Sequence, residues 1–349
     1  MLDCDDLVGP SAVVTREAQQ YSVIASYVHA ISSALDSRGV DARAVFREAG
    51  VEFQASPDPL ARLRNEEVSR LFEVATRTTG DPYFGIAVGN LLQFSYLHAL
   101  GYGLMASATL RDFYQRVCNY YRLASPNADF RHFSQDGACI LEASNVRASV
   151  CHESQDVFAV LMVRYMRFLY QRELDPLWME LVRPCPHPDA QPFLEYFRCP
   201  VRFAAPVLRV AIEERHMDEP LPGSNPELAL QNDQVVIRYL ARLDKSDIVT
   251  SVRGMIIADL SAGAVNRQSV AERLHMSARN LQARLAARGT TFQEVLDSTR
   301  SQLALGYIEQ RSLAIKEITY LLGFADTATF TRAFRRWTSN SPSEYRARK

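Results

Sequence analysis

The C-terminal part of the chain contains a helical apolar pattern that breaks at a glycine and then resumes. The pattern runs from Ile315, stops at Gly323 and continues after Asp326, which is a good N-cap for a second helix. The apolar side of that helix consists of Phe330, Ala333, Phe334 and Trp337. Its other side carries Thr327, Thr331, Arg332, Arg335 and Arg336. A short helix, a tight turn and a helix with a basic outer face predict a helix-turn-helix motif, whose second helix enters the DNA major groove.

The same arrangement occurs once more, upstream of this motif. Residues 268–275 have an amphipathic helical pattern, and Ser277 is a good N-cap for a following helix. That helix has Leu281 and Leu285 on its apolar side and ends at Gly289. Its exposed side carries Arg279, Asn280, Gln282 and Arg284. The sequence therefore predicts two helix-turn-helix motifs in tandem.

A single helix, Phe292 to Gln310, is predicted between the two motifs. Nineteen residues at about 1.5 Å each span roughly 28 Å, and one turn of B-DNA is about 34 Å. A stiff spacer of this length would place the two recognition helices in successive major grooves on one face of the duplex. Gly306 lies inside this helix and costs about 1 kcal/mol relative to alanine.

These residues resemble the AraC/XylS-type transcription regulators. The resemblance covers Ile248 to Arg346, and its most specific stretch is GF-x-D-x-x-x-F-x-R-x-F-R-R-W followed by SPSEYR. Two small departures from the family pattern are His275, where Gly is common, and Thr319, where a small apolar residue is usual.

The resemblance implies which side chains meet DNA. Exposed positions early in each recognition helix contact base edges in the family; here they are Arg279, Gln282, Ala283, Thr327, Ala328 and Arg332. Arginine can bind guanine, glutamine can bind adenine, and alanine or threonine methyl groups can pack on thymine. Phosphate contacts, which fix register but not sequence, are expected from Ser277, Arg284, Thr329 and Arg335.

Residues 1–245 predict an α+β domain, and residues 246–349 an all-α DNA-binding domain, with a linker at 244–247. The expected helices are Tyr21–Ser37, 41–50, Glu66–Thr79, Leu97–Ser107, Leu110–Leu123, Glu153–Leu174 and Pro226–Leu243, with a further helix starting at Pro82. The expected strands are Phe130–Phe133, Ala138–Ala143, Met179–Val182, Val201–Phe203 and Leu208–Ile212. Asp136-Gly137 is a strong hairpin signal between the first two strands.

The N-terminal region resembles the arabinose-binding-like sensor and dimerisation domain of one branch of the same family. The resemblance is carried by PYFGIAVGNLL, by GYGLMASATLRDFYQRVCNYYRLASP and by the hairpin after it. It implies that a small effector or a second subunit controls the C-terminal domain.

Charge divides the chain in the same way. The net charge is −1, but residues 247–349 contain 15 Lys and Arg against 9 Asp and Glu, which leaves −7 on the remainder. A basic C-terminal part and an acidic N-terminal part suit one DNA-facing domain and one that is not. No apolar run approaches the roughly twenty residues of a membrane span, and the N-terminus lacks a secretory signal. The six cysteines form no C-x-x-C pair and are expected to be reduced thiols.

Other candidate sites have simpler structural explanations. Cys151-His152-Glu153 resembles a nucleophile beside a base, but adjacent residues do not face each other and no third group orients them. His187 has no metal partners at suitable spacing. The aromatic group Phe113, Tyr114, Tyr120 and Tyr121 could line a ligand pocket or belong to the core. The arginines Arg164, Arg167 and Arg172 could bind a carboxylate effector or lie on a solvated edge.

The sequence thus predicts a bacterial, sequence-specific transcription regulator that binds double-stranded DNA and a small effector. We expect a cytoplasmic, nucleoid-associated homodimer that contacts RNA polymerase if it activates transcription, with no metal and no cofactor. Two alternatives remain: a constitutive dimeric DNA-binding regulator without a ligand, or an enzyme fused to a DNA-targeting tail. The enzyme alternative lacks both a four-cysteine zinc cluster and a nucleophile elbow, so no enzymatic activity is expected.

Overall fold

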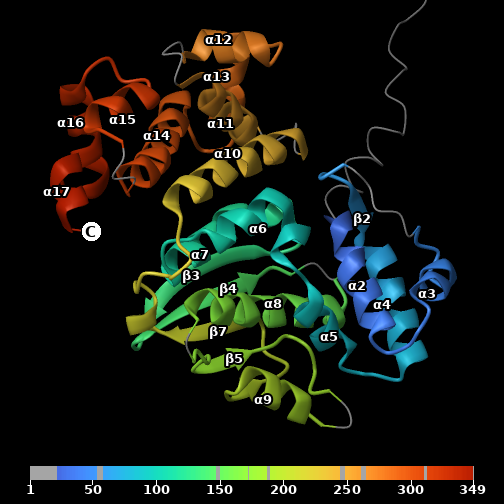
Figure 1. Cartoon of the computed structure of the whole chain (residues 1–349). Coiled ribbons are helices and arrows are strands. Elements are labelled where there is room, and N and C mark those ends of the chain that lie inside the picture. Colours follow the sequence, from blue (N-terminus) through green and yellow to red (C-terminus); the bar gives the residue numbers. More distant parts are fainter. Residues whose placement is uncertain are drawn as a thin grey trace, which may run out of the picture. The chain divides into compact units, whose positions relative to one another are not determined.

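The computed structural model describes residues 22–52, 58–146, 150–171, 173–186, 189–243, 248–260, 265–309 and 313–348. The chain forms two compact units, residues 1–224 and 225–349, shown in one continuous colour gradient in Figure 1. The linker expected at 244–247 lies outside the described residues. Helix α10 (Pro226–Leu243), which precedes it, belongs to the second unit, so the compact units divide about one helix earlier than the expected boundary at 245.

The first unit begins with a small antiparallel sheet, made of β1 (Ser22–Ile24) and β2 (Arg62–Arg64). The helix expected over Tyr21–Ser37 is therefore wrong at its start, because α2 covers only Val28–Asp36. The backbone explains the difference: β1 pairs with β2, and the Ile24 N–H donates to the Ala124 carbonyl. The other helices of this unit are α3 (Ala42–Glu48), α4 (Asn65–Thr79), α5 (Phe84–Leu91), α6 (His98–Met105), α7 (Leu110–Tyr120), α8 (His152–Tyr170) and α9 (Gln191–Phe197).

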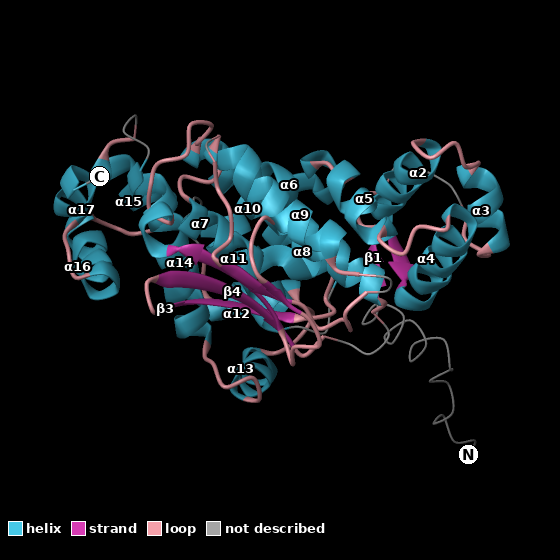
Figure 2. Cartoon of the chain, turned by 90° about the horizontal axis from the view of Figure 1, so that it is seen from below, coloured by secondary structure: helices cyan, strands magenta, loops and turns pink. Residues whose placement is uncertain are grey.

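A five-stranded sheet in the order β3-β4-β7-β5-β6 forms the centre of the first unit. Its strands are β3 (Asp129–Gln135), β4 (Ala138–Ser144), β5 (Trp178–Glu180), β6 (Val201–Arg202) and β7 (Leu208–Glu213). The predicted hairpin is confirmed: Asp136 and Gly137 have φ of 50° and 77°, and Gln135 pairs with Ala138 across them. Two positive φ values suit the tight turn that matches the strand twist. Figure 2 shows the strands side by side, with α7 and α8 along the sheet.

Alternating charges cross the sheet from one strand to the next. Glu142 on β4 accepts hydrogen bonds from Arg131 on β3 and Arg209 on β7, each at 2.6 Å. Arg209 also contacts Glu180 on β5, which pairs with Arg202 on β6. The hydrogen bond from Arg131 and the contact with Arg209 hold the pKa of Glu142 below its usual range. These cross-strand pairs favour one register, because a slip of one residue would separate the charges.

Helices α5 and α8 pack closely because α5 presents glycines to α8. A Cβ on Gly89 would lie 2.5 Å from Val160 Cγ1, and one on Gly85 would lie 2.8 Å from the Glu153 carbonyl oxygen. Only glycine permits this approach, so the stretch 82–92, whose pattern resembles the sensor domain, has a structural role in joining the two helices.

The described elements of the second unit are all helices, and their buried apolar residues form one hydrophobic core. Its helices are α10, α11 (Ile248–Asp259), α12 (Arg267–Arg273), α13 (Ala278–Ala286), α14 (Phe292–Glu309), α15 (Ile315–Leu321), α16 (Thr327–Thr338) and α17 (Pro342–Arg348). Leu230 of α10, Leu281 of α13 and Phe330 of α16 belong to the same buried cluster. The predicted fold class, an N-terminal α+β domain followed by a helical domain, is confirmed. Among the described helices of the whole chain, none is both long and apolar enough to cross a membrane.

Candidate nucleic-acid interface

The first helix-turn-helix motif consists of α12, a short turn and α13. Leu281 and Leu285 are completely buried, as the apolar pattern predicted. The Ser277 hydroxyl accepts a hydrogen bond of 3.2 Å from the Asn280 N–H and so caps α13. His275, in the turn, has φ of 54°. This left-handed backbone explains why glycine is common at that position.

The second motif consists of α15, a turn at Gly323 and α16. Asp326 caps α16 by accepting a hydrogen bond of 2.7 Å from the Thr329 N–H, which lowers the pKa of Asp326. Phe330 and Phe334 are completely buried on the predicted apolar side. Gly323 has φ of 65°, and a Cβ there would lie 2.7 Å from the Leu260 carbonyl oxygen. Thr319 is buried, and its hydroxyl donates to the Ile315 carbonyl, so the departure from a small apolar residue leaves no unpaired polar group.

Helix α14 lies between the two motifs, with α11 on one side and α15–α17 on the other (Figure 1). The predicted linker helix is confirmed over Phe292–Glu309; Gln310 lies outside the described residues. Its eighteen residues span about 27 Å. Gly306 has a packing role here, since a Cβ would lie 3.2 Å from Leu230 Cδ1 on α10.

Three arginines connect α14 to the second motif and to the following helix α17. Arg300 donates to the carbonyl oxygens of Leu322 and Gly323 at 2.9 and 2.8 Å, and its guanidinium lies 4.4 Å from the Phe324 ring centre. Arg336 of α16 forms an ion pair of 2.9 Å with Asp297 of α14. Arg346 of α17 donates to the Ile308 carbonyl. Sequence reasoning missed Arg300, because its role depends on a turn more than twenty residues away.

The predicted DNA-contacting residues are found along the outer sides of α13 and α16. Exposed side chains are those of Arg279, Ala283, Arg284, Thr327, Ala328, Arg332 and Arg335, together with the cap residue Ser277. Gln282 and Thr329 are half-buried. Arg332 donates to the Thr329 hydroxyl at 3.2 Å, and that hydroxyl donates to Asp326. Arg336, noted on the basic face, is held by Asp297 and is less available for DNA than Arg332 or Arg335.

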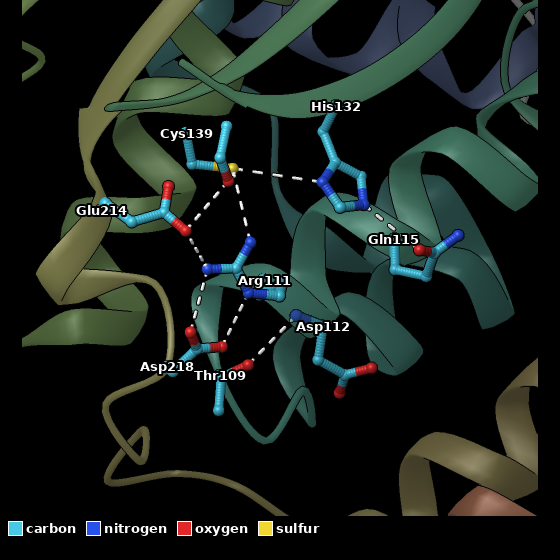
Figure 3. A network of polar contacts seen from close by, with 9 residues as sticks. Thr109, Arg111, Asp112, Gln115, His132, Cys139, Glu214 and Asp218 are labelled. Atoms are coloured by element: carbon cyan, nitrogen blue, oxygen red, sulfur yellow. Dashed lines mark hydrogen bonds and ion pairs between the residues drawn. The ribbon is translucent and has the colours of Figure 1, made fainter. Parts of the chain in front are cut away.

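The polar network in Figure 3 is a structural feature of the first unit. Arg111, at the start of α7, donates to Asp218 at 2.7 Å and also binds Glu214. His132 and Arg111 each lie 4.0 Å from the Cys139 sulfur. Burial nevertheless raises the pKa of Cys139 to about 11, so the thiol is not activated. The network holds the segment after β7 against α7.

The other candidate sites of the first unit are explained by packing. Phe113, Tyr114 and Tyr120 are buried in the core, and Tyr121 lines a cavity of the first unit. Arg164 donates to the Leu92 carbonyl, and Arg167 donates to the carbonyls of Leu174, Tyr196 and Phe197.

Cys151, the candidate nucleophile, is a protonated thiol near neutral pH. Cys151 donates to the Ser154 hydroxyl at 3.4 Å, and burial raises its pKa to about 11. Arg172 and His187 lie outside the described residues, as does Cys4. The remaining cysteines, Cys118, Cys139, Cys151, Cys185 and Cys199, are free thiols. In the described part of the chain, no three metal-binding side chains come together.

The two capped recognition helices have exposed polar starts, share one core and are separated by helix α14. This arrangement defines a protein with a tandem helix-turn-helix unit. Residues 39–221 match the family described as the arabinose-binding domain of AraC transcription regulators, and residues 270–348 match a helix-turn-helix domain family. The chain therefore belongs to the AraC family of transcription regulators.

Similar proteins include regulators that match over nearly the whole chain. An ornithine utilization regulator of Pseudomonas aeruginosa is 30% identical over 325 residues, which cover 92% of this chain and 95% of that protein. A helix-turn-helix transcriptional regulator of Mycobacterium tuberculosis is 27% identical, over 90% of this chain and 93% of that protein. The crystal structure of the regulator CdpR from P. aeruginosa is 21% identical, covers 87% of this chain and 96% of that one, and has a TM-score of 0.44.

Proposed function

We propose that this regulator places α13 and α16 in successive major grooves on one face of a DNA duplex. The observation that carries the proposal is the single core shared by both motifs, with α14 as a spacer of about 27 Å. A spacer of this length is close to one helical turn of DNA, so two exposed helix starts can meet the same face.

Base readout is proposed for six side chains at the starts of the recognition helices. These are Arg279, Gln282, Ala283, Thr327, Ala328 and Arg332. Arg279 and Arg332 are the strongest readers, because an exposed arginine can bind guanine through two hydrogen bonds. Phosphate contacts are proposed for Ser277, Arg284, Thr329 and Arg335.

Control by a small effector bound to the first unit completes the proposal. The match of residues 39–221 to the arabinose-binding family supports this role. An effector acts by favouring the conformation that binds DNA. We further propose a cytoplasmic, nucleoid-associated homodimer without enzymatic activity, which contacts RNA polymerase where it activates transcription.

Genome-wide footprinting of the purified full chain on fragmented DNA from its own source tests the proposal. We expect discrete sites, each with two short sequence motifs one helical turn apart. A double variant, Arg279→Ala with Arg332→Ala, should lose these sites, whereas Arg47→Ala, an exposed arginine of the first unit, should keep them. Salt-sensitive binding to all fragments without preferred sites would contradict sequence-specific regulation.

A further inference from the structure

A cavity of about 100 Å³ lies in the first unit, between α4, α8 and strands β1, β3 and β4. One water molecule needs roughly 10–15 Å³ on this scale, so the cavity has room for a small organic molecule. The residues around it come from distant parts of the chain and include Ile24, Tyr27, Val68, Phe158 and Leu208.

The walls of this cavity are aromatic and uncharged. The rings of Tyr121, Phe130 and Phe158 lie against one another, with centres 5.0 to 5.2 Å apart. Among the described residues that line the cavity there is no Asp, Glu, Lys, Arg or His. A carboxylate or ammonium group placed here would lose its water without gaining an ion pair, which is strongly unfavourable.

Two buried polar atoms of side chains that line the cavity, the Tyr27 hydroxyl and Gln155 Oε1, have no hydrogen-bond partner among the described residues. The carboxamides of Asn65 and Asn127 are paired with each other, at 3.0 and 2.9 Å. Gln155 differs: its Nε2 donates to the Val150 carbonyl at 3.3 Å, whereas its buried Oε1 has no hydrogen-bond partner among the described residues. A buried acceptor without a partner is costly, and a donor supplied by a ligand would remove that cost.

We infer that this cavity is the effector site of the sensor unit, and that it binds an uncharged, mainly apolar molecule with one hydroxyl or N–H group. The Gln155 Oε1 accepts the hydrogen bond from that group, and the aromatic walls contact the apolar part. The inference rests on the effector control proposed above. Because the walls come from α4, α8 and the sheet, a bound molecule stabilises their arrangement.

The test uses the full chain and four probes of one size: benzyl alcohol, toluene, benzoate and benzylamine. Their dissociation constants are measured at pH 7 by ligand-observed NMR, on the wild type and on Gln155→Leu. We expect benzyl alcohol to bind the wild type and to bind Gln155→Leu about three- to tenfold more weakly, the worth of one hydrogen bond. Toluene should bind both proteins equally, and the two charged probes at least about tenfold more weakly than benzyl alcohol.

Two further variants locate the binding. Ala143→Leu, which places a larger side chain in the cavity wall, should abolish binding of benzyl alcohol and toluene. Gln191→Leu, at an exposed glutamine outside the cavity, should leave both unchanged. Thermal unfolding confirms that each variant is folded; should Ala143→Leu not fold, Gln155→Leu alone decides.

Several results would overturn the inference: equal binding of benzyl alcohol to the wild type and Gln155→Leu, tighter binding of a charged probe, or no binding of any neutral probe. Footprinting on the same preparation separates this failure from failure of the proposed function. Discrete DNA sites without probe binding would refute only the effector site. Probe binding without discrete DNA sites would refute only sequence-specific regulation.

Discussion

The turns of the two helix-turn-helix motifs require the same backbone conformation but use different residues. His275 in the first turn and Gly323 in the second have φ of 54° and 65°. The left-handed region costs a residue with a Cβ about 1–2 kcal/mol, although histidine tolerates it better than most. At Gly323 there is also no room for a side chain, because the Leu260 carbonyl oxygen lies too close. The first turn has space for one, since His275 is exposed.

Replacing the first turn residue should therefore stabilise the second unit. We expect His275→Gly to raise the free energy of unfolding by about 0.5–1 kcal/mol, since relief of the left-handed backbone outweighs the added entropy of the unfolded chain. Gly323→Ala should lower it, through strain and the contact with Leu260. Urea unfolding followed by the fluorescence of Trp337, in the same core, measures both. If His275→Gly instead lowers the free energy of unfolding, the histidine side chain makes a stabilising contact that outweighs the strain of its backbone.

Two arginines on α16 separate base readout from phosphate binding. Arg332→Ala should cost about 1–3 kcal/mol on the preferred site and relax the preference at one base pair. Arg335→Ala, on the same helix and also exposed, should weaken binding on every sequence by a similar factor. Affinities for a library of single-base variants, at one fixed salt concentration, distinguish the two patterns. A uniform loss in Arg332→Ala would assign that side chain to the phosphates.

At the scale of elements, helices, caps and turns that depend on neighbouring residues could be predicted from the sequence. Elements that depend on contacts with distant residues could not. The caps Ser277 and Asp326, the Asp136-Gly137 hairpin and helix α14 depend on neighbouring residues, and each forms as predicted. Strands β1 and β2 each have three residues, and they form because they pair with each other across 38 to 42 positions of the chain. Helix α9 was not predicted; Pro192 lies in its first turn, where proline is tolerated.

The candidate sites follow the same division. The exposed sides of α13 and α16 are periodic in sequence, so their residues could be named in advance. The cavity could not be predicted, because its walls combine residues from 23 to 208 and Gln155 belongs to no motif. An unpaired amide oxygen is visible only once the neighbours of the side chain are known.

Helix α8 contains a buried aspartate that makes the stability of the first unit depend on pH. Asp156 is 1% exposed and pairs with Arg183; burial raises its pKa to about 8, Arg183 opposes the rise, and Glu153 adds to it. Between about pH 4 and pH 8 the folded protein holds a proton that the unfolded chain releases. Stability from this group is therefore full below about pH 4 and is lost as the pH rises towards 8.

Asp156→Asn should remove this dependence. We expect the wild type to lose stability from pH 5 to pH 8, by up to about 1.4 kcal/mol per pH unit, and the variant to show a flatter profile. Urea unfolding in a Trp337→Phe background leaves Trp178 of β5 as the sole tryptophan and reports on the first unit. Asp175→Asn, at a more exposed aspartate paired with Arg167, serves as the control and should retain the wild-type slope. Parallel profiles of wild type and Asp156→Asn would mean that Asp156 stays ionised in the fold.

At the scale of the whole molecule, both recognition helices belong to the second unit. The second unit has one core that includes α10 and both motifs, and the ion pair between Asp297 and Arg336 ties α16 directly to α14. We therefore expect the two recognition helices to move together. An effector bound in the first unit then has to change the position or availability of this body as a whole, since a change of angle between the motifs would disrupt the shared core.

A rigid spacing between the recognition helices makes a prediction about the operator. Inserting five base pairs between the two sequence motifs turns one of them to the opposite face of the duplex, so we expect affinity to fall by roughly a hundredfold or more. Inserting ten base pairs returns both sequence motifs to the same face of the duplex but moves them about 34 Å further apart. Helix α14 cannot span this added distance, so affinity should stay low. Fluorescence anisotropy at one salt concentration measures both, with the same insertions outside the motifs as controls. Recovery of affinity at ten base pairs would mean that the motifs are joined flexibly, contrary to their common core.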